Sequence, residues 1–453
     1  MTQRLSIIII GGGASGVLLA AHLLRDQDMD LRVTLIEKRA DLGRGVAYSA
    51  RQFDHVLNVA APNMSAYADD PDHFWRWLKT RGLVHEDNRF AFVPRRHYGA
   101  YLADVVDGLT DDGRLQVVHG TVTSLTTTNA SVAAVLDAGA SIVGHVAVLA
   151  VGHEEQPARS KGIAVRVGSE ADTPLDRDAP VMILGSGLSM VDAWLTLAQA
   201  GHRGPVTVVS RHGLLPKSHR QVEKFQLDAA DVPFGTGLHY FTRWFRDTVE
   251  EAVGHGKDWR SVVDALRPFN QRIWQGWSDG ARRSFLEHVR PIWNIHRHRL
   301  PPDLYRRLAD AVEAGQVTLI AGKFLDVRRD GDTVVATVRR KGVANTEEFR
   351  VARVYDCGGV SVDVEQSSNP VIRQLLAQGA ARPDRMHIGL DVTEMGEVVS
   401  ADGVPAERLF AIGPLTRGAF FEIEAIPDIR VQCAELAERL LRHADRVLDR
   451  RFR

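Results

Sequence analysis

The stretch LSIIIIGGGASG, residues 5–16, decides how this chain folds. Its first half is a continuous run of apolar, mostly β-branched residues, which is typical of a central parallel strand buried on both faces. Its second half has the spacing G-x-G-x-x-G. Good helix formers follow over residues 17–25, and a second apolar run covers Leu31–Glu37. The pattern predicts a strand–helix–strand unit of a doubly wound α/β fold.

Each part of this glycine-rich turn has a physical reason to bind a dinucleotide. The first glycine allows a tight turn out of the strand, the second lets backbone approach a pyrophosphate, and the third lets helix pack closely on strand. The phosphates then lie at the helix N-terminus, where N–H groups and the helix dipole favour negative charge. Glu37 ends the second strand, where a carboxylate accepts hydrogen bonds from ribose hydroxyls and repels a 2′-phosphate. We therefore expect an adenine dinucleotide site on Gly11, Gly13, Ala14, Ser15, Gly16, Glu37 and Lys38. The alternative is a tight turn without a ligand.

A second unit of the same kind follows, with a strand at Val181–Leu184, a turn at residues 185–189, a helix over 190–200 and a strand over 206–209. Its turn keeps two glycines and puts Met190 in the third position. Arg211 follows the second strand, near the position that Glu37 has in the first unit, and a guanidinium there suits a 2′-phosphate. NADPH is thus favoured over NADH, unless Arg211 and His212 are solvated loop residues. The expected binding residues are Gly185, Gly187, Leu188, Ser189, Arg211 and His212.

Two dinucleotide sites on one chain imply a relay in which nicotinamide passes hydride to a bound flavin, so the first site is expected to hold FAD. Residues 115–120, 131–137 and 145–150 suggest a short antiparallel set, and residues 221–308 suggest a helical insertion rich in Trp and Arg. Strand character returns at 317–320, 333–339, 347–355 and 409–412, before a closing helix over 429–448. We expect an α/β fold of two Rossmann-like dinucleotide-binding domains. The FAD domain comprises 1–153 and 351–453, and the NAD(P)H domain comprises 178–350 with the insertion.

Composition excludes several other classes of protein. The 56 Lys and Arg nearly balance the 57 Asp and Glu of the 453 residues, so no global field favours nucleic acid or an anionic membrane. Cys357 and Cys433 are the only cysteines, and they form neither a CxxC dithiol nor a disulfide scaffold. No apolar stretch reaches the roughly 18 residues of a membrane span. We expect a soluble, unprocessed cytoplasmic protein, and a homo-oligomer is compatible with the sequence.

The sequence resembles the two-dinucleotide-binding-domain flavoproteins, and among them a bacterial FAD/NAD(P)-binding group related to class B and N-hydroxylating amine monooxygenases. The resemblance runs nearly end to end. It is carried by the two glycine turns and by GRGVAY at 43–48, HVLNVAAPNMS at 55–65, DPDHFWRWL at 70–78, FVPRRHYGAYL at 92–102, RHRLPP at 297–302 and LFAIGPLTRG at 409–418.

The resemblance implies roles for further residues. The segment with Gly45 encloses the FAD phosphates and ribityl chain, and Arg95 or Arg96, with Tyr98 and Tyr101, lies near the flavin. Gly413 belongs to a late segment that brings backbone to the flavin ring. Ala150-Val151-Gly152 and Cys357-Gly358-Gly359 resemble the crossovers between the two domains. Asn58, Asn63, Met64 and Ser65 are candidate flavin or substrate neighbours, the alternative being a well-hydrogen-bonded loop. For the tyrosines the alternative is a packed amphipathic helix.

The implied mechanism is that NADPH reduces FAD, O₂ adds at the flavin C4a, and the resulting (hydro)peroxyflavin oxygenates a soft nucleophile, foremost an amine nitrogen. The insertion would supply the substrate pocket, with Arg290, Arg297 and Arg299 as candidates for binding a carboxylate, or as an ordinary solvated face. Its tryptophans either seal that pocket or form core. His296 and His298 have no Cys or acidic partner set, so no metal is expected.

Two other functions remain open at this point. One is an NAD(P)H-dependent flavin reductase or oxidase without oxygen insertion, and the other is an FAD-binding sensor without turnover. A disulfide reductase is disfavoured because the two cysteines cannot form a CxxC dithiol.

Overall fold

The computed structural model describes residues 4–27, 29–48, 55–85, 89–110, 113–154, 162–167, 169, 172–358 and 363–442. The chain divides into two compact units. The first comprises Met1–Glu154, Asn270–Asp279 and Ser361–Arg453, and the second comprises Glu155–Phe269 and Gly280–Val360. The ten residues 270–279 of the expected insertion therefore belong to the first unit.

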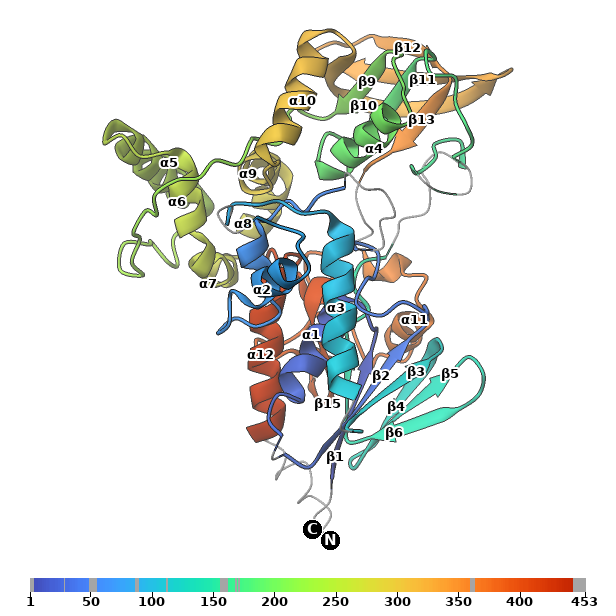
Figure 1. The fold of residues 1–453 in the computed structure, drawn as a ribbon, viewed down its shortest axis with the longest axis vertical. Helices are drawn as coiled ribbons and strands as arrows, with labels where there is room; N and C mark the ends of the chain where they lie inside the picture. Colours follow the sequence, from blue (N-terminus) through green and yellow to red (C-terminus); the bar gives the residue numbers. More distant parts are fainter. Residues whose placement is uncertain are drawn as a thin grey trace. The chain divides into compact units, whose positions relative to one another are not determined.

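The first unit is built on a six-stranded sheet in the order β14-β15-β7-β1-β2-β3. Five strands are parallel because apolar runs bury both faces of each central strand, and β14 pairs antiparallel at one edge. Helices α1, α3 and α12 lie side by side along the sheet (Figure 1). The strands are β1 Leu5–Ile10, β2 Leu31–Glu37, β3 Leu115–His119, β7 Val146–Leu149, β14 Glu397–Val399 and β15 Pro405–Ala411.

The helices of this unit pack against the sheet and form one large hydrophobic core with it. They are α1 Ala14–Leu23, η1 Ala61–Met64, α2 His73–Thr80, α3 Arg95–Thr110, α7 Asn270–Gly276, η5 Val364–Gln366, α11 Pro370–Ala377, η6 Gly413–Thr416 and α12 Ile426–Arg442. A separate antiparallel sheet is formed by β4 Val122–Thr127, β5 Val132–Leu136 and β6 Ser141–Gly144.

The second unit repeats the plan with the order β12-β11-β10-β9-β8-β13. Its parallel part is β10, β9, β8 and β13, and the hairpin of β10 and β11 extends it through antiparallel pairing. The strands are β8 Val181–Leu184, β9 Val206–Ser210, β10 Val317–Asp330, β11 Thr333–Arg340, β12 Thr346–Val351 and β13 Arg353–Asp356. The helices are α4 Leu188–Gln199, α5 Leu238–Gly254, α6 Trp259–Ala265, η3 Arg267–Phe269, α8 Asp279–Ser284, η4 Phe285–Val289, α9 Arg290–Arg297 and α10 Pro302–Glu313.

Both sheets confirm the expected fold class, but several expected elements are wrong in detail. Of the short antiparallel set, only β5 is antiparallel, since β3 and β7 are parallel members of the main sheet. The residues expected as one strand over 347–355 form two, β12 and β13, in different ladders. The expected closing helix begins earlier, at Ile426, and residues 443–448 lie outside the described part of the chain.

The described residues contain no helix that is both long enough and apolar enough to cross a membrane.

Candidate functional site

The first glycine turn has the geometry that a dinucleotide requires. Gly11 has φ +110°, and a Cβ there would lie 2.4 Å from the carbonyl oxygen of Ala150. A Cβ on Gly16 would lie 1.9 Å from the Gly11 oxygen, so helix α1 approaches the turn at a distance that only glycine permits. Gly13, the N-cap of α1, differs because a Cβ there would meet only the Cα of Gly45, at 3.6 Å. The space beside Gly13 thus leaves the N–H groups of the first helical turn, beginning at Ala14 and Ser15, accessible, as a pyrophosphate site requires.

Glu37 closes this turn from the end of β2. Its Oε2 accepts a hydrogen bond from the Gly12 N–H at 2.7 Å, and its Oε1 accepts one from Arg39 at 2.9 Å. A carboxylate has about four acceptor positions, so both oxygens can still accept ribose hydroxyls. The neighbouring Lys38 is exposed.

The second turn repeats the backbone contacts of the first. Gly11 donates to Ile36 at 2.8 Å, and Gly185 donates to Val209 at the same distance. A Cβ on Gly185, which has φ +98°, would lie 2.6 Å from the Cys357 oxygen, as one on Gly11 would approach Ala150. The segments 150–152 and 357–358 therefore end equivalent strands, β7 and β13, beside equivalent turns. Gly359 of the expected second crossover lies outside the described residues.

The opening beside the second turn is also preserved. Gly187 is the N-cap of α4, and a Cβ there would meet nothing within 4 Å. Leu188 and Ser189 begin the helix. Met190 stands in place of the third glycine and is fully buried, so here the helix packs through a side chain.

At the end of β9 a hydroxyl replaces the carboxylate of the first unit. Ser210 Oγ accepts hydrogen bonds from Ser186 Oγ at 2.9 Å and from the Gly213 N–H at 3.0 Å. Arg211 is exposed and His212 is half-buried. Burial lowers the pKa of His212, and the charges of Lys341 and Arg211 lower it further. The edge lacks the negative charge of Glu37 and is positively charged, as a 2′-phosphate requires.

Three other expected FAD contacts gather in the first unit. Gly45 has φ +50° and faces Gly13. Arg95 begins α3 and donates from Nε to the Val56 oxygen at 3.2 Å. Gly413 has φ +69°, and its N–H donates to Gln432 Oε1 at 2.7 Å, while a Cβ on it would meet Ser15 Oγ at 2.5 Å. The late segment is therefore held against the first turn of α1.

The candidates at Asn58–Ser65 separate into two kinds. Met64 is 2% exposed and belongs to the core. Ser65 is fully buried, and its hydroxyl donates to the Asp70 oxygen at 2.6 Å and accepts from Tyr67 at 3.1 Å. These hydrogen bonds hold Ser65 within the loop, and Met64 packs in the core, whereas Asn63 is exposed and Asn58 is half-buried.

The tyrosines of α3 are likewise packed within the unit. Tyr98 and Tyr101 are fully buried. The Tyr101 hydroxyl lies 2.7 Å from His73 Nδ1 and accepts from the Ala66 N–H at 3.0 Å.

A small, partly open pocket of the first unit is lined by residues that the sequence analysis did not single out, His153 and Arg417 among them. It is lined at the carboxyl ends of β7 and β15 by Gly152, His153 and Arg417, among others. Arg417 is 6% exposed, lies 2.5 Å from Glu424 through Nε and donates from Nη2 to His153 Nδ1 at 3.3 Å. Since arginine has no acceptor, His153 Nδ1 accepts, and the neutral ring carries its proton on Nε2. Burial lowers the pKa of His153. The sequence signal that could have identified His153 is its position directly after the Gly152 crossover.

The basic candidates of the helical region have different surroundings. Arg299 is 3% exposed, pairs with Asp264 and lies over the Trp259 ring at 5.9 Å. It is therefore part of the packing of the second unit, and its role as a ligand of a substrate carboxylate stays a prediction. Arg290 and Arg297 lie at the two ends of α9 and are half-buried.

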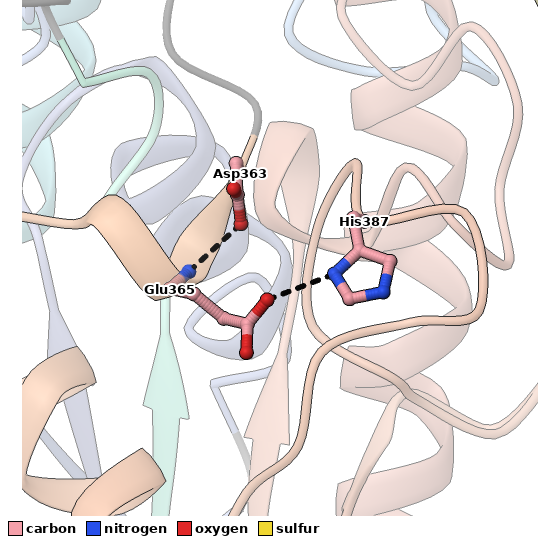
Figure 2. Close-up of side chains that lie close together, drawn as sticks. All are labelled: Asp363, Glu365 and His387. Carbon is pink, nitrogen blue, oxygen red and sulfur yellow. Dashed lines mark hydrogen bonds and ion pairs between the residues drawn. The ribbon is translucent and has the colours of Figure 1, made fainter.

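The described residues contain one group with metal-ligand spacing, formed by Asp363, Glu365 and His387, whose ligand atoms lie within 4.8 Å of one another (Figure 2). These side chains already have partners. Asp363 accepts from the Glu365 N–H at 3.1 Å as a helix cap, and Glu365 lies 2.9 Å from His387 Nδ1. Glu365 and His387 are exposed, and we assign no metal to them.

Comparison with known proteins agrees with this geometry. A search of the curated proteins found no match. Similar solved structures include the ornithine N-hydroxylase of Kutzneria sp. 744, solved with reduced FAD, NADP⁺ and L-ornithine (14% identity, TM-score 0.66, covering 98% of this chain and 100% of that one). They also include L-lysine 6-monooxygenase of Pseudomonas syringae (15%, 0.65, 96% and 99%) and thioredoxin reductase of Lactococcus lactis (11%, 0.55, 97% and 100%). Residues 8–154 match the FAD-NAD(P)-binding family. The chain therefore has the fold of the two-dinucleotide-binding-domain flavoproteins, and its residues 8–154 are an FAD-NAD(P)-binding domain.

Proposed function

We propose that this chain is an FAD-dependent, NADPH-using monooxygenase that hydroxylates the nitrogen of a small amine. The observation that carries the proposal is the pair of equivalent glycine turns, one hydrogen-bonded to Glu37 and the other to Ser210, which the exposed Arg211 follows. Enzymes that hydroxylate ornithine and lysine share the fold over nearly the whole chain, which supports the choice of reaction.

FAD is assigned to the first unit because the residues there fit it. The opening beside Gly13 and Gly45 admits the pyrophosphate, Ala14, Ser15 and Gly16 offer the helix N-terminus, and Glu37 binds a ribose. Lys38, Arg95, Gly152 and Gly413 complete the proposed set. When bound, FAD would supply hydride acceptance and oxygen activation. The FAD domain is predicted over residues 1–153 and 351–453. Of these, β13 at 353–356 belongs to the sheet of the second unit, whereas α7 belongs to the first unit.

NADPH is assigned to the second unit, within the proposed domain 178–350. The opening beside Gly187 admits its phosphates to the start of α4 at Leu188 and Ser189. Gly185 permits the tight turn, and Arg211 with His212 would contact the 2′-phosphate.

The substrate and O₂ are the remaining partners. Arg290, Arg297 and Arg299 are the predicted ligands of a substrate carboxylate. Asn58, Asn63, Met64 and Ser65 are the predicted neighbours of the flavin or substrate. The protein's own task is to exclude water while the oxygen is transferred. We place the activity in the reducing cytoplasm, because neither cysteine forms a disulfide.

The cysteines argue against the disulfide reductases that share this fold. Cys433 is fully buried in the first unit, and Cys357 belongs to the second. Burial raises the pKa of Cys433 and raises the pKa of Cys357 to about 12, so neither thiol ionises near neutral pH. The chain therefore has no dithiol that could attack a disulfide.

The test is to mix the purified holoprotein with NADPH in air. Flavin absorbance, NADPH consumption and peroxide are recorded while primary amines, amino acids and sulfides are supplied in turn. A hydroxylated amine formed in proportion to NADPH consumed supports the proposal. NADPH oxidation that yields only peroxide with every substrate indicates a reductase or oxidase, and a flavin that NADPH never reduces refutes an enzymatic role.

A further inference from the structure

A row of residues crosses the sheet of the second unit where β9 ends. Ser210 on β9 pairs with Ala321 on β10. The Lys341 N–H, directly after β11, donates to the Ala321 oxygen at 2.8 Å. Gly213, in the turn after β9, lies against the same residue, since a Cβ on it would come within 3.2 Å of Ala321 Cβ. Lys341 therefore lies two strands from Ser210, at the same edge of the sheet as Arg211.

The charges at this edge are not balanced by acids. Two cations of the hairpin are paired, with Arg340 at 2.7 Å from Glu347 and Arg328 at 3.1 Å from Glu348. Within the described part of the chain, no ion pair to an acid involves Arg211, His212 or Lys341. Lys341 is exposed, and its charge acts on His212 in lowering the pKa of that histidine. An edge with uncompensated positive charge and hydroxyl groups suits a dianion.

We propose that Lys341 is a specificity-determining residue that binds the 2′-phosphate of NADPH together with Arg211, reaching it from the hairpin rather than from the loop after β9. The inference rests on the proposed function and deepens it, since it identifies which residue outside the dinucleotide turn selects NADPH over NADH. Lysine suits this role as a compact, flexible point charge on a long stem. A lysine that only solubilises the hairpin would affect both nucleotides equally.

The experiment measures the dissociation constants of NADPH and NADH by calorimetry under anaerobic conditions, for the holoprotein whose flavin has been reduced with dithionite and can accept no hydride. The 2′-phosphorylated fragment 2′,5′-ADP is a third ligand. The variant is Lys341→Gln, and Lys341→Arg restores the charge. The matched control is Arg328→Gln, which removes one positive charge from the same hairpin. It lies seven residues along β10 from Ala321, a distance of about 23 Å in a strand.

Lys341→Gln is expected to weaken NADPH and 2′,5′-ADP about tenfold, which corresponds to ~1.4 kcal/mol, and to change NADH by less than about twofold. Lys341→Arg should recover most of the lost affinity. Arg328→Gln should leave the affinities for NADPH and 2′,5′-ADP unchanged relative to that for NADH. An unchanged NADPH-to-NADH ratio in Lys341→Gln overturns the inference while the proposed function stands. A wild-type protein that binds neither nucleotide overturns both.

Discussion

Gly13 and Gly16 lie three residues apart, but a methyl group would have different consequences at each. At Gly16 it would meet backbone of the preceding turn at 1.9 Å, whereas at Gly13, where φ is −72°, it would enter the space assigned to the pyrophosphate. The motif spacing predicts both glycines. The structure gives Gly16 a packing role, and the binding role of Gly13 stays a prediction.

Gly16→Ala is expected to destabilise the protein by about 3 kcal/mol or more, because a backbone oxygen cannot move aside as a side chain would. Gly13→Ala is expected to change the free energy of unfolding by less than about 1 kcal/mol and to lower FAD content sharply. Urea unfolding and flavin absorbance measure the two quantities. Full FAD content in Gly13→Ala would place the pyrophosphate elsewhere.

His153 gives a second prediction at this scale, through pH. Burial and the Arg417 charge lower its pKa, against the opposing effect of Glu424, so the folded state binds fewer protons than the unfolded state. The resulting stability is present above the ordinary histidine pKa of about 6.5 and is lost as pH falls below it. The free energy of unfolding should therefore fall more steeply between pH 7.5 and 5.5 in the wild type than in His153→Gln.

The matched control for this pH dependence is His119→Gln, which removes an exposed histidine. If His119→Gln flattens the pH profile as much as His153→Gln does, His153 is not the group responsible.

At the scale of elements, α7 is anchored in the first unit by one tryptophan. Trp274 is fully buried, stacks on Phe421 with ring centroids 4.8 Å apart, and donates from Nε1 to the Gly418 oxygen at 2.8 Å. Asn270 adds a hydrogen bond to Glu422 at 2.8 Å. These contacts explain why this part of the helical region belongs to the FAD-binding unit.

Trp274→Ala is expected to cost about 3–5 kcal/mol of stability, as for other large-to-small core substitutions. Trp274→Phe keeps the stacking on Phe421 and loses the indole hydrogen bond. Losing that hydrogen bond is expected to lower the free energy of unfolding by about 1 kcal/mol, in addition to the effect of the smaller ring on packing. Urea unfolding of the holoprotein measures both variants. Equal costs would show that the Gly418 hydrogen bond carries the anchor and the stacking does not.

Elements could be predicted from sequence where local pattern and tertiary setting agree. The bounds of β1, β2 and β8 follow from buried apolar runs that end at glycine or at an acid. The pairing of β7 could not be predicted in this way. Its four residues Val146–Leu149 are all buried, and only their contact with β1, far away in sequence, makes the strand parallel. In the same way, nothing local in residues 270–279 indicates which core Trp274 enters, and the pairing of Arg299 with Asp264 depends on how the helices pack.

At the scale of the whole molecule, the two units share the same strand–turn–helix arrangement, but the first has the carboxylate of Glu37 where the second has the hydroxyl of Ser210. In each unit the first glycine of the turn lies against a carbonyl that directly follows a strand, that of Ala150 after β7 or of Cys357 after β13. In each unit the next glycine of the motif, Gly13 or Gly187, is the N-cap of the following helix. The first unit closes the turn with a carboxylate and the second with a hydroxyl. This repetition was visible in the sequence, whereas the positions of His153 beside Arg417 and of Lys341 beside Ala321 depend on contacts between distant segments.

Because FAD is assigned to the first unit and NADPH to the second, we expect that a substitution in one unit can abolish the binding of one nucleotide without affecting the other. In Gly187→Glu a carboxylate would occupy the opening at the start of α4 and repel the nucleotide phosphates, without meeting protein atoms near the new Cβ. The variant should keep its FAD and be reduced normally by dithionite, while its reduction by NADPH slows by more than about tenfold, equivalent to over 1.4 kcal/mol. Gly13→Glu, the matched change in the first unit, should instead lose FAD. Stopped-flow absorbance with the two reductants measures the contrast. Reduction of Gly187→Glu by NADPH at the wild-type rate would mean that NADPH does not bind at the second glycine turn, since dithionite needs no binding site and NADPH does.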